Sequence, residues 1–251
     1  MTPPEFDLSE PVFSPLPPAS TLTVRPRLFG FAIYMVLFSL SPVVFIPLVP
    51  VLRYLLPKSL TTANALLYYI VVVFSCVIAL IYVAAKQPTP TTLREVWLSV
   101  LGDRKKHWVN LSLGIGLYVP VFVCVAIAVF ASSRLFEIVP HPALKEFHNA
   151  NRFNQGLLLL QAVVFAPIIE ETMFRGLLFT ALRDLWGKGA AILVSGFVFA
   201  AVHPGLPGAL LPLWTLGIAL AMVYSWRRSL VVCIVLHMTF NAVTFIAQFY
   251  Q

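Results

Sequence analysis

The length, composition and charge of the chain exclude an ordinary soluble protein. Of its 251 residues, 59% are hydrophobic and only 11% are charged, whereas soluble domains carry about 25% charged residues. A soluble fold of this composition would expose large apolar patches and aggregate. The formal net charge of +7 is interpreted as a membrane-topology signal. No basic stripe with interleaved aromatic residues occurs in a polar segment, so no nucleic-acid partner is expected.

The N-terminal residues differ in composition from the rest of the chain. Residues 1–26 hold seven prolines and three acidic residues. Such a segment cannot bury a core, so a disordered, extended tail is predicted there. It has no basic start followed by a short apolar run, so it is not interpreted as a secretory signal. Residues 27–251 are predicted to form the membrane domain, with the chemically informative motifs in 150–245.

Long stretches without charge predict an all-α, polytopic membrane bundle of about seven to eight transmembrane helices. No charged residue lies in 28–52, 59–85 or 107–133, and each stretch exceeds the roughly 20 residues that cross the hydrocarbon. The predicted spans are 28–52, 66–85, 108–131, 156–180, 189–203, 208–226 and 229–249. An eighth helix, interfacial or re-entrant, is the alternative for 93–101 or 142–155.

The distribution of basic residues predicts the orientation of these spans. With the N-terminus inside, eleven lysines and arginines fall on inner segments and five on outer segments. This bias predicts a cytoplasmic N-terminus and an external C-terminus. An even number of spans would return the C-terminus to the cytoplasm. The expected location is a membrane as a multi-pass protein, which in a bacterium means the cell (inner) membrane.

The first informative motif places three ionisable residues inside an apolar span. Glu170, Glu171 and Arg175 lie within six residues, and ionisable groups at bilayer depth are usually paired or functional. Glu171 and Arg175 are four residues apart, so they share a helix face and can form an ion pair. Glu170 is rotated by about 100° and can face another partner. Pro167 lacks an N–H and is expected to kink or open the helix.

Two later spans supply imidazole and amide groups. His203 precedes Pro204 at the end of one span, while His237 and Asn241 share one face of the last span. With Glu170 as general base, such a set can polarise a water molecule, and imidazole or amide groups can stabilise an oxyanion. The pattern predicts a hydrolase without a serine or cysteine nucleophile.

Zinc is an alternative for the same residues. Two histidines and a glutamate form a known catalytic ligand set. There is no HExxH motif, however, and the three groups come from three spans. Cys76, Cys124 and Cys233 lie in apolar runs without a CxxC pair, so neither a disulfide nor a zinc framework is expected. A mechanism without metal or other cofactor is therefore favoured.

Three motifs occur in order within the C-terminal spans: Glu170-Glu171-x-x-x-Arg175, Phe199-x-x-x-His203 and His237-x-x-x-Asn241. Together they resemble the type II CAAX prenyl endopeptidases, a membrane family that also includes bacteriocin-processing and self-immunity proteins. The resemblance implies a glutamate-dependent intramembrane endopeptidase. It implies that Glu170 and His203 activate water, that His237 and Asn241 form the oxyanion site, and that Glu171, Arg175 and Phe199 support them.

The resemblance also implies a peptide or protein substrate associated with the bilayer, with or without a prenyl group. Two other function classes stay open. One is a non-catalytic immunity or scaffold protein of the same fold, and the other is a transporter or proton relay. A purely structural interpretation also stays open for the Glu171 and Arg175 pair, which can pack two helices without chemistry. The substrate and the oligomeric state are not determined by the sequence.

Overall fold

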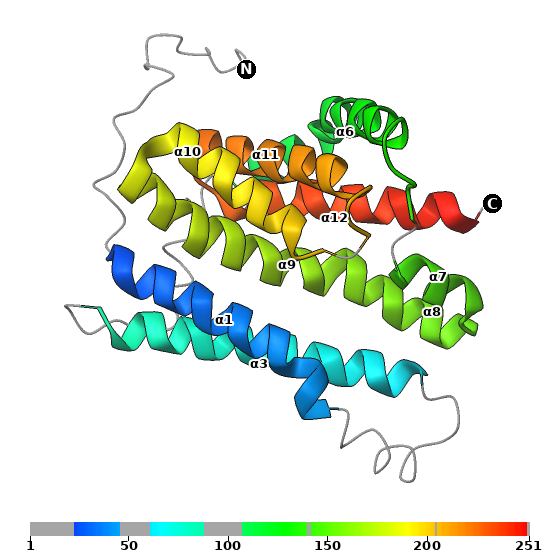
Figure 1. The fold of residues 1–251 in the computed structure, drawn as a ribbon, viewed down its shortest axis with the longest axis horizontal. Coiled ribbons are helices and arrows are strands. Elements are labelled where there is room, and N and C mark those ends of the chain that lie inside the picture. The colour runs from blue at the N-terminus through cyan, green and yellow to red at the C-terminus, as the bar shows by residue number, and fades with distance from the viewer. Residues whose placement is uncertain (1–22, 46–60, 88–106, 140–141, 204, 250–251) are drawn as a thin grey trace, which may run out of the picture.

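The computed structural model describes residues 23–45, 61–87, 107–139, 142–203 and 205–249, all of whose regular elements are helices (Figure 1). The N-terminal helices are α1 (Val24–Phe45), α3 (Thr61–Ala85), α5 (His107–Gly116), α6 (Tyr118–Ser133) and α7 (Pro142–Asn149). The C-terminal half comprises α8 (Arg152–Leu159), η2 (Leu160–Phe165), α9 (Ala166–Glu171), η3 (Thr172–Phe179), α10 (Thr180–Ala201), α11 (Leu210–Arg227) and α12 (Leu230–Phe249). The predicted tail up to residue 22 and the stretch 93–101 lie outside the described residues.

Within the described residues, four helical stretches are long and apolar enough to cross a membrane. They are Trp108–Ser133, Arg152–Ala201, Leu210–Arg227 and Leu230–Ala247. A shorter apolar helix is found at Val73–Ala85. These stretches agree with an all-α, multi-pass membrane protein, as predicted. Helix α1 begins at Val24 and ends at Phe45, so it starts before the predicted span 28–52, whose last residues lie outside the described part.

The predicted spans 156–180 and 189–203 belong to one helical stretch of 50 residues. Gly187 interrupts it, because its φ of 82° is not helical and only glycine adopts such a value readily. The chain doubles back at this point, so the second part of α10 runs beside the preceding segment (Figure 1). The predicted alternative helix within 142–155 exists as α7, an eight-residue helix, followed by the start of α8.

Contacts at the helix ends agree with the predicted alternation of inner and outer segments. Arg27 precedes the first predicted span and Asp184 follows the fourth, and both were expected on the inner side. Their side chains form an ion pair of 2.5 Å. At the other end, the Ser132 hydroxyl donates to the Gly208 carbonyl over 2.7 Å. Segments expected on the same side therefore meet, whereas the absolute orientation stays a prediction.

Glycines allow the closest helix contacts, as is common where helices pack in a membrane. A Cβ atom added to Gly30 of α1 would lie 2.5 Å from the Val83 Cγ2 atom of α3. Between α10 and α11, a Cβ on Gly217 would lie 2.8 Å from the Gly196 Cα atom. The second contact brings α11 against the helix that carries His203.

The buried core is centred on η3 and α10 rather than on the N-terminal pair α1 and α3. Met173, Leu177, Phe179 and Phe199 are all fully buried. Large apolar residues on the outer faces of α3 and α6 are exposed instead, with Phe130 at 61% exposure. Exposed apolar surfaces of this kind are suited to contact with lipid. Polar side chains such as Glu171 and Arg175 are buried in the interior instead.

Candidate active site

The helix that carries the two glutamates is distorted on both sides of them. Two π-helical segments, η2 and η3, flank the short helix α9 that ends at Glu171. Such bulges often occur at functional sites. Pro167 gives a local reason, because it has no N–H to donate within the helix. The sequence predicted a kink or opening here, and the structure contains two wide helical turns instead.

Glu171 and Arg175 form the predicted ion pair, with 3.2 Å between Arg175 Nη1 and Glu171 Oε1. Both side chains are completely buried. Arg175 Nη2 also donates to the Gly217 carbonyl of α11 over 3.0 Å, and the guanidinium lies 4.7 Å from the centre of the Phe199 ring. The pair therefore connects η3 with both α10 and α11.

Glu170 faces a different direction and meets both motif histidines. Its Oε2 atom lies 3.7 Å from His203 Nε2 and 3.8 Å from His237 Nε2. These separations are too long for direct hydrogen bonds but suit a bridging water molecule. Three side chains that are far apart in the chain thus converge on one point.

The opposite ring nitrogens of both histidines are held by acceptors. His203 Nδ1 lies 2.5 Å from the Phe199 carbonyl oxygen, which can only accept, so this nitrogen carries a proton. His237 Nδ1 lies 3.0 Å from Glu171 Oε1 and donates to that carboxylate. In the neutral form of each ring, the Nε2 lone pair therefore faces Glu170. The two rings also pack on the Phe199 ring, at centroid separations of 4.5 and 5.8 Å.

His203 reaches this position because its helix is short. After the break at Gly187, residues 188–201 rise by about 21 Å, which is less than the roughly 30 Å of the hydrocarbon. The chain then leaves the helix and Gly205 adopts a φ of 95°, a conformation available to glycine. The helix end therefore presents His203 toward Glu170 rather than toward the far membrane surface.

Asn241 is placed differently from the other motif residues. Its Nδ2 atom donates to the Ala162 carbonyl over 2.8 Å, and no contact with Glu170 is found among the described residues. In the π-helical pattern of η2, where the Ala166 N–H donates to the Gln161 carbonyl, the next donor to Ala162 would be residue 167. Pro167 has no N–H. The Asn241 amide supplies the donor that this proline lacks.

Several partners of the site could not be found from side-chain motifs. The carbonyls of Phe199 and Gly217 are backbone groups, and the sequence carries no signal for them. Pro167 did carry a signal for the free Ala162 carbonyl, because a proline inside a helix always leaves an acceptor without its donor. The double contact of His237 with Glu170 and Glu171 was also missed, since it depends on how the two helices face each other.

Among the described residues, no group of three or more His, Cys, Asp or Glu side chains has the geometry of a metal site. The three cysteines are free. Cys233 is buried and its thiol lies 3.5 Å from the Leu220 carbonyl. None of them takes part in the cluster around Glu170.

The fold and the site together define a multi-pass membrane protein with a cluster of one carboxylate and two imidazoles beside a fully buried ion pair. Residues 152–243 match the family model described as type II CAAX prenyl endopeptidase Rce1-like. The chain therefore carries a domain of this family, which confirms the resemblance drawn from the three motifs. The matched range contains every candidate site residue.

Two curated proteins of Lactococcus lactis subsp. lactis (strain IL1403) are similar to parts of the chain. The UPF0177 protein YxdF is 32% identical over 78 residues, covering 31% of this chain and 42% of the relative. The UPF0177 protein YaiF is 30% identical over 145 residues, covering 56% of this chain and 65% of the relative. Neither name states an activity. No solved structure shows a significant match to this chain.

Proposed function

We propose that the protein is an intramembrane endopeptidase that uses Glu170 and His203 to activate water. The observation that carries the proposal is the convergence of three side chains, with Glu170 Oε2 3.7 Å from His203 Nε2 and 3.8 Å from His237 Nε2. A carboxylate and an imidazole that can share one water molecule are the elements of general base catalysis.

The tautomers favour a specific water geometry. Because Nδ1 of His203 donates to a backbone carbonyl, its Nε2 atom is an acceptor in the neutral ring. A water molecule between Nε2 and the Glu170 carboxylate would donate one hydrogen to each of them. Its oxygen lone pairs would then be directed away from both groups and toward a peptide carbonyl. Transfer of a proton to Glu170 would accompany the attack.

His237 is the imidazole proposed for the oxyanion site. Its Nδ1 atom donates to Glu171, and its Nε2 atom lies 3.8 Å from Glu170 Oε2. The ring therefore borders the point where the water molecule and the peptide carbonyl would meet.

The remaining motif residues would act through their neighbours. Arg175 and Glu171 fix the tautomer and orientation of His237, as a buried carboxylate does in other imidazole sites. Phe199 supplies both a ring under the two imidazoles and a carbonyl for His203. The second N–H of the Asn241 amide is the group that would complete the oxyanion site.

The proposed substrate is a peptide bond in a membrane-associated protein, with or without a prenyl group. The match of residues 152–243 to a family of CAAX prenyl endopeptidases supports a protein substrate. The chain spans only 42% and 65% of the lengths of the two curated relatives.

The test compares the wild-type protein with Glu170→Gln in a host that lacks the gene. Mass spectrometry of membrane-protein fragments, above all C-terminal ones, should reveal cleavage products that require Glu170. The variant should lose at least about 100-fold in rate, since a positioned general base contributes 10²–10⁴-fold. Glu137→Gln is the matched control, because Glu137 is exposed and lies outside the cluster. Retained cleavage by a folded Glu170→Gln protein would contradict the proposal.

The same variants separate the other function classes. If the Glu170→Gln protein fully rescues the phenotype of a deletion strain, the protein acts as a non-catalytic immunity or scaffold protein. If purified protein in liposomes shows substrate-dependent ion flux and no peptidase activity, a transporter or proton relay is favoured.

A further inference from the structure

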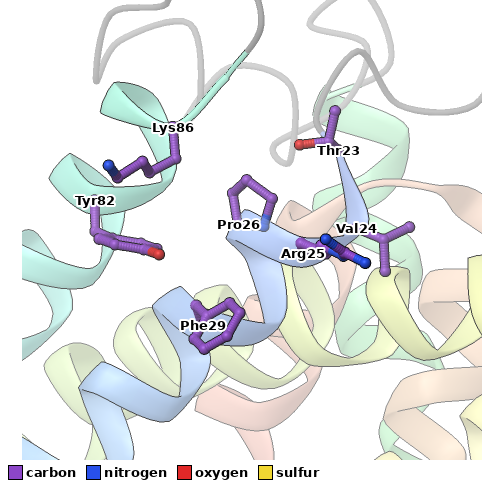
Figure 2. A pocket seen from close by; sticks show the side chains of 7 residues that line it. All are labelled: Thr23, Val24, Arg25, Pro26, Phe29, Tyr82 and Lys86. Atoms are coloured by element: carbon purple, nitrogen blue, oxygen red, sulfur yellow. The ribbon is translucent and has the colours of Figure 1, made fainter.

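A wide-open cavity of about 570 Å³ lies on the surface outside the candidate active site, between the beginning of α1 and the end of α3. Figure 2 shows its lining side chains: Tyr82 of α3 and Lys86, the residue after that helix, flank one side, and Arg25 from the first turn of α1 flanks the other. Phe29 lies between these two sides (Figure 2). The cavity is therefore cationic on two sides and apolar in the middle.

The two cations are unpaired within the part of the chain that the structure describes. Arg25 and Lys86 are exposed, and neither forms an ion pair with any described residue. Arg27, two residues further along α1, behaves in the opposite way. It is almost fully buried, pairs with Asp184 and donates to the Thr23 carbonyl over 3.1 Å. The structure thus separates one basic residue that holds helices together from two that line opposite sides of the cavity.

The walls of the cavity are held together before any ligand binds. The Thr23 N–H donates to Gln87 Oε1 over 2.9 Å, which joins the start of α1 to the end of α3. Gln87 also donates to the Val83 carbonyl over 2.8 Å. Beside these contacts, Gly30 allows α1 and α3 to approach closely. A Cβ atom added to Gly30 would lie only 2.5 Å from Val83 Cγ2. A preformed cavity loses less entropy on binding than a disordered surface.

The apolar part of the lining selects among anions. Phe29 is 59% exposed. It belongs to α1, whose outer surface is predicted to face lipid. A soluble phosphate would use only the two cations and the Tyr82 hydroxyl. An anionic phospholipid would use these groups for its phosphate and the Phe29 side for its glycerol and acyl chains. The position also fits, because both helix ends lie on the side predicted to be cytoplasmic, where anionic lipid attracts basic side chains.

We propose that this cavity binds the headgroup of an anionic glycerophospholipid, with Arg25 and Lys86 as the two phosphate-binding cations. The site is independent of the proposed peptidase chemistry. It ties the N-terminal helix pair to the anionic membrane surface, at the end of α1 that is also paired with Asp184 of α10.

The test uses the purified full chain in a neutral detergent, titrated separately with phosphatidylglycerol and phosphatidylcholine. The thermal unfolding midpoint reports binding, because a ligand specific for the folded state raises it. Phosphatidylglycerol should raise the midpoint and phosphatidylcholine should not. In Arg25→Gln/Lys86→Gln, the apparent Kd for phosphatidylglycerol should rise by about 30-fold, which is about fivefold per cation near an anionic surface.

Matched variants make the outcome specific. Arg134→Gln/Lys145→Gln removes two exposed cations from the other predicted side and should leave the Kd unchanged, while Arg25→Lys/Lys86→Arg should keep binding. Equal losses in the two glutamine variants, or none in Arg25→Gln/Lys86→Gln, would overturn the proposal. So would stabilisation of the wild type by inorganic phosphate alone to the same extent, since the site would then be one for free phosphate.

Discussion

The Asn241 amide occupies the place of the N–H that Pro167 lacks, and this predicts an energetic coupling between the two residues. Replacing Asn241 with alanine removes the donor to the Ala162 carbonyl. Replacing Pro167 with alanine restores a backbone donor. In a π-helical turn the new N–H reaches Ala162, and in an α-helical turn the N–H of Ala166 does so instead. Either arrangement makes the Asn241 contact dispensable.

The size of the coupling follows from the contact. A buried polar group left without its partner costs about 1–3 kcal/mol, and polar contacts between membrane helices average about 0.6 kcal/mol with a maximum of about 1.7. This contact is short, at 2.8 Å, but only partly buried. We therefore expect Asn241→Ala to lower the free energy of unfolding by about 1 kcal/mol in the natural background. In the Pro167→Ala background the loss should be close to zero.

The four proteins of this double-mutant cycle can be compared by equilibrium unfolding in mixed micelles. A loss that is the same in both backgrounds would refute the reasoning, because Asn241 would then stabilise the fold through another contact. Cleavage by the same four proteins addresses the oxyanion role separately. If the double variant regains stability but not activity, the Asn241 amide contacts the reacting carbonyl as well as Ala162.

Three further predictions concern the packing and the chemistry of the site. Gly217→Ala should reduce stability by about 1–3 kcal/mol and lower cleavage, because the new methyl overlaps Gly196; thermal unfolding should show no loss in the control Gly156→Ala, where nothing lies within 4 Å. Arg175→Lys keeps the charge but cannot hold Glu171 and the Gly217 carbonyl together, so kcat should fall with little change in KM. Removal of metal with 1,10-phenanthroline should leave cleavage unchanged if the mechanism is metal-independent. Loss of cleavage that zinc restores would establish the zinc alternative.

Local rules were sufficient for much of the fold. Stretches without charge identified the helices, because crossing a membrane requires both apolar side chains and internally satisfied backbone groups. The boundary between the fourth and fifth predicted spans was less accurate, since the helix continues to the turn at Gly187. The two π-helical segments on either side of α9 were not predicted, because their formation depends on what the neighbouring helices offer to the freed carbonyls.

The candidate site was predictable as a set of residues but not as a network. Helix spacing correctly paired Glu171 with Arg175 and turned Glu170 toward another partner. His203 was the residue whose depth was hardest to assign, and its 3.7 Å approach to Glu170 depends on where α10 ends, at Ala201. Asn241 shares a helix face with His237, yet its amide meets a backbone carbonyl rather than the Glu170 carboxylate.

The sequence by itself determined the membrane class, the alternation of the spans and the identity of the polar residues among them. It could do so because hydrophobicity and helix periodicity are local properties, and because a buried charge is too costly to occur without a partner or a role. Only the tertiary structure decided which partner each group has. Close contacts at Gly196 and Gly217, the turn at Gly187 and the carbonyl freed by Pro167 bring together groups that are far apart in the chain. Once they are together, the Phe199 carbonyl and the Glu171 carboxylate orient the two histidines toward Glu170.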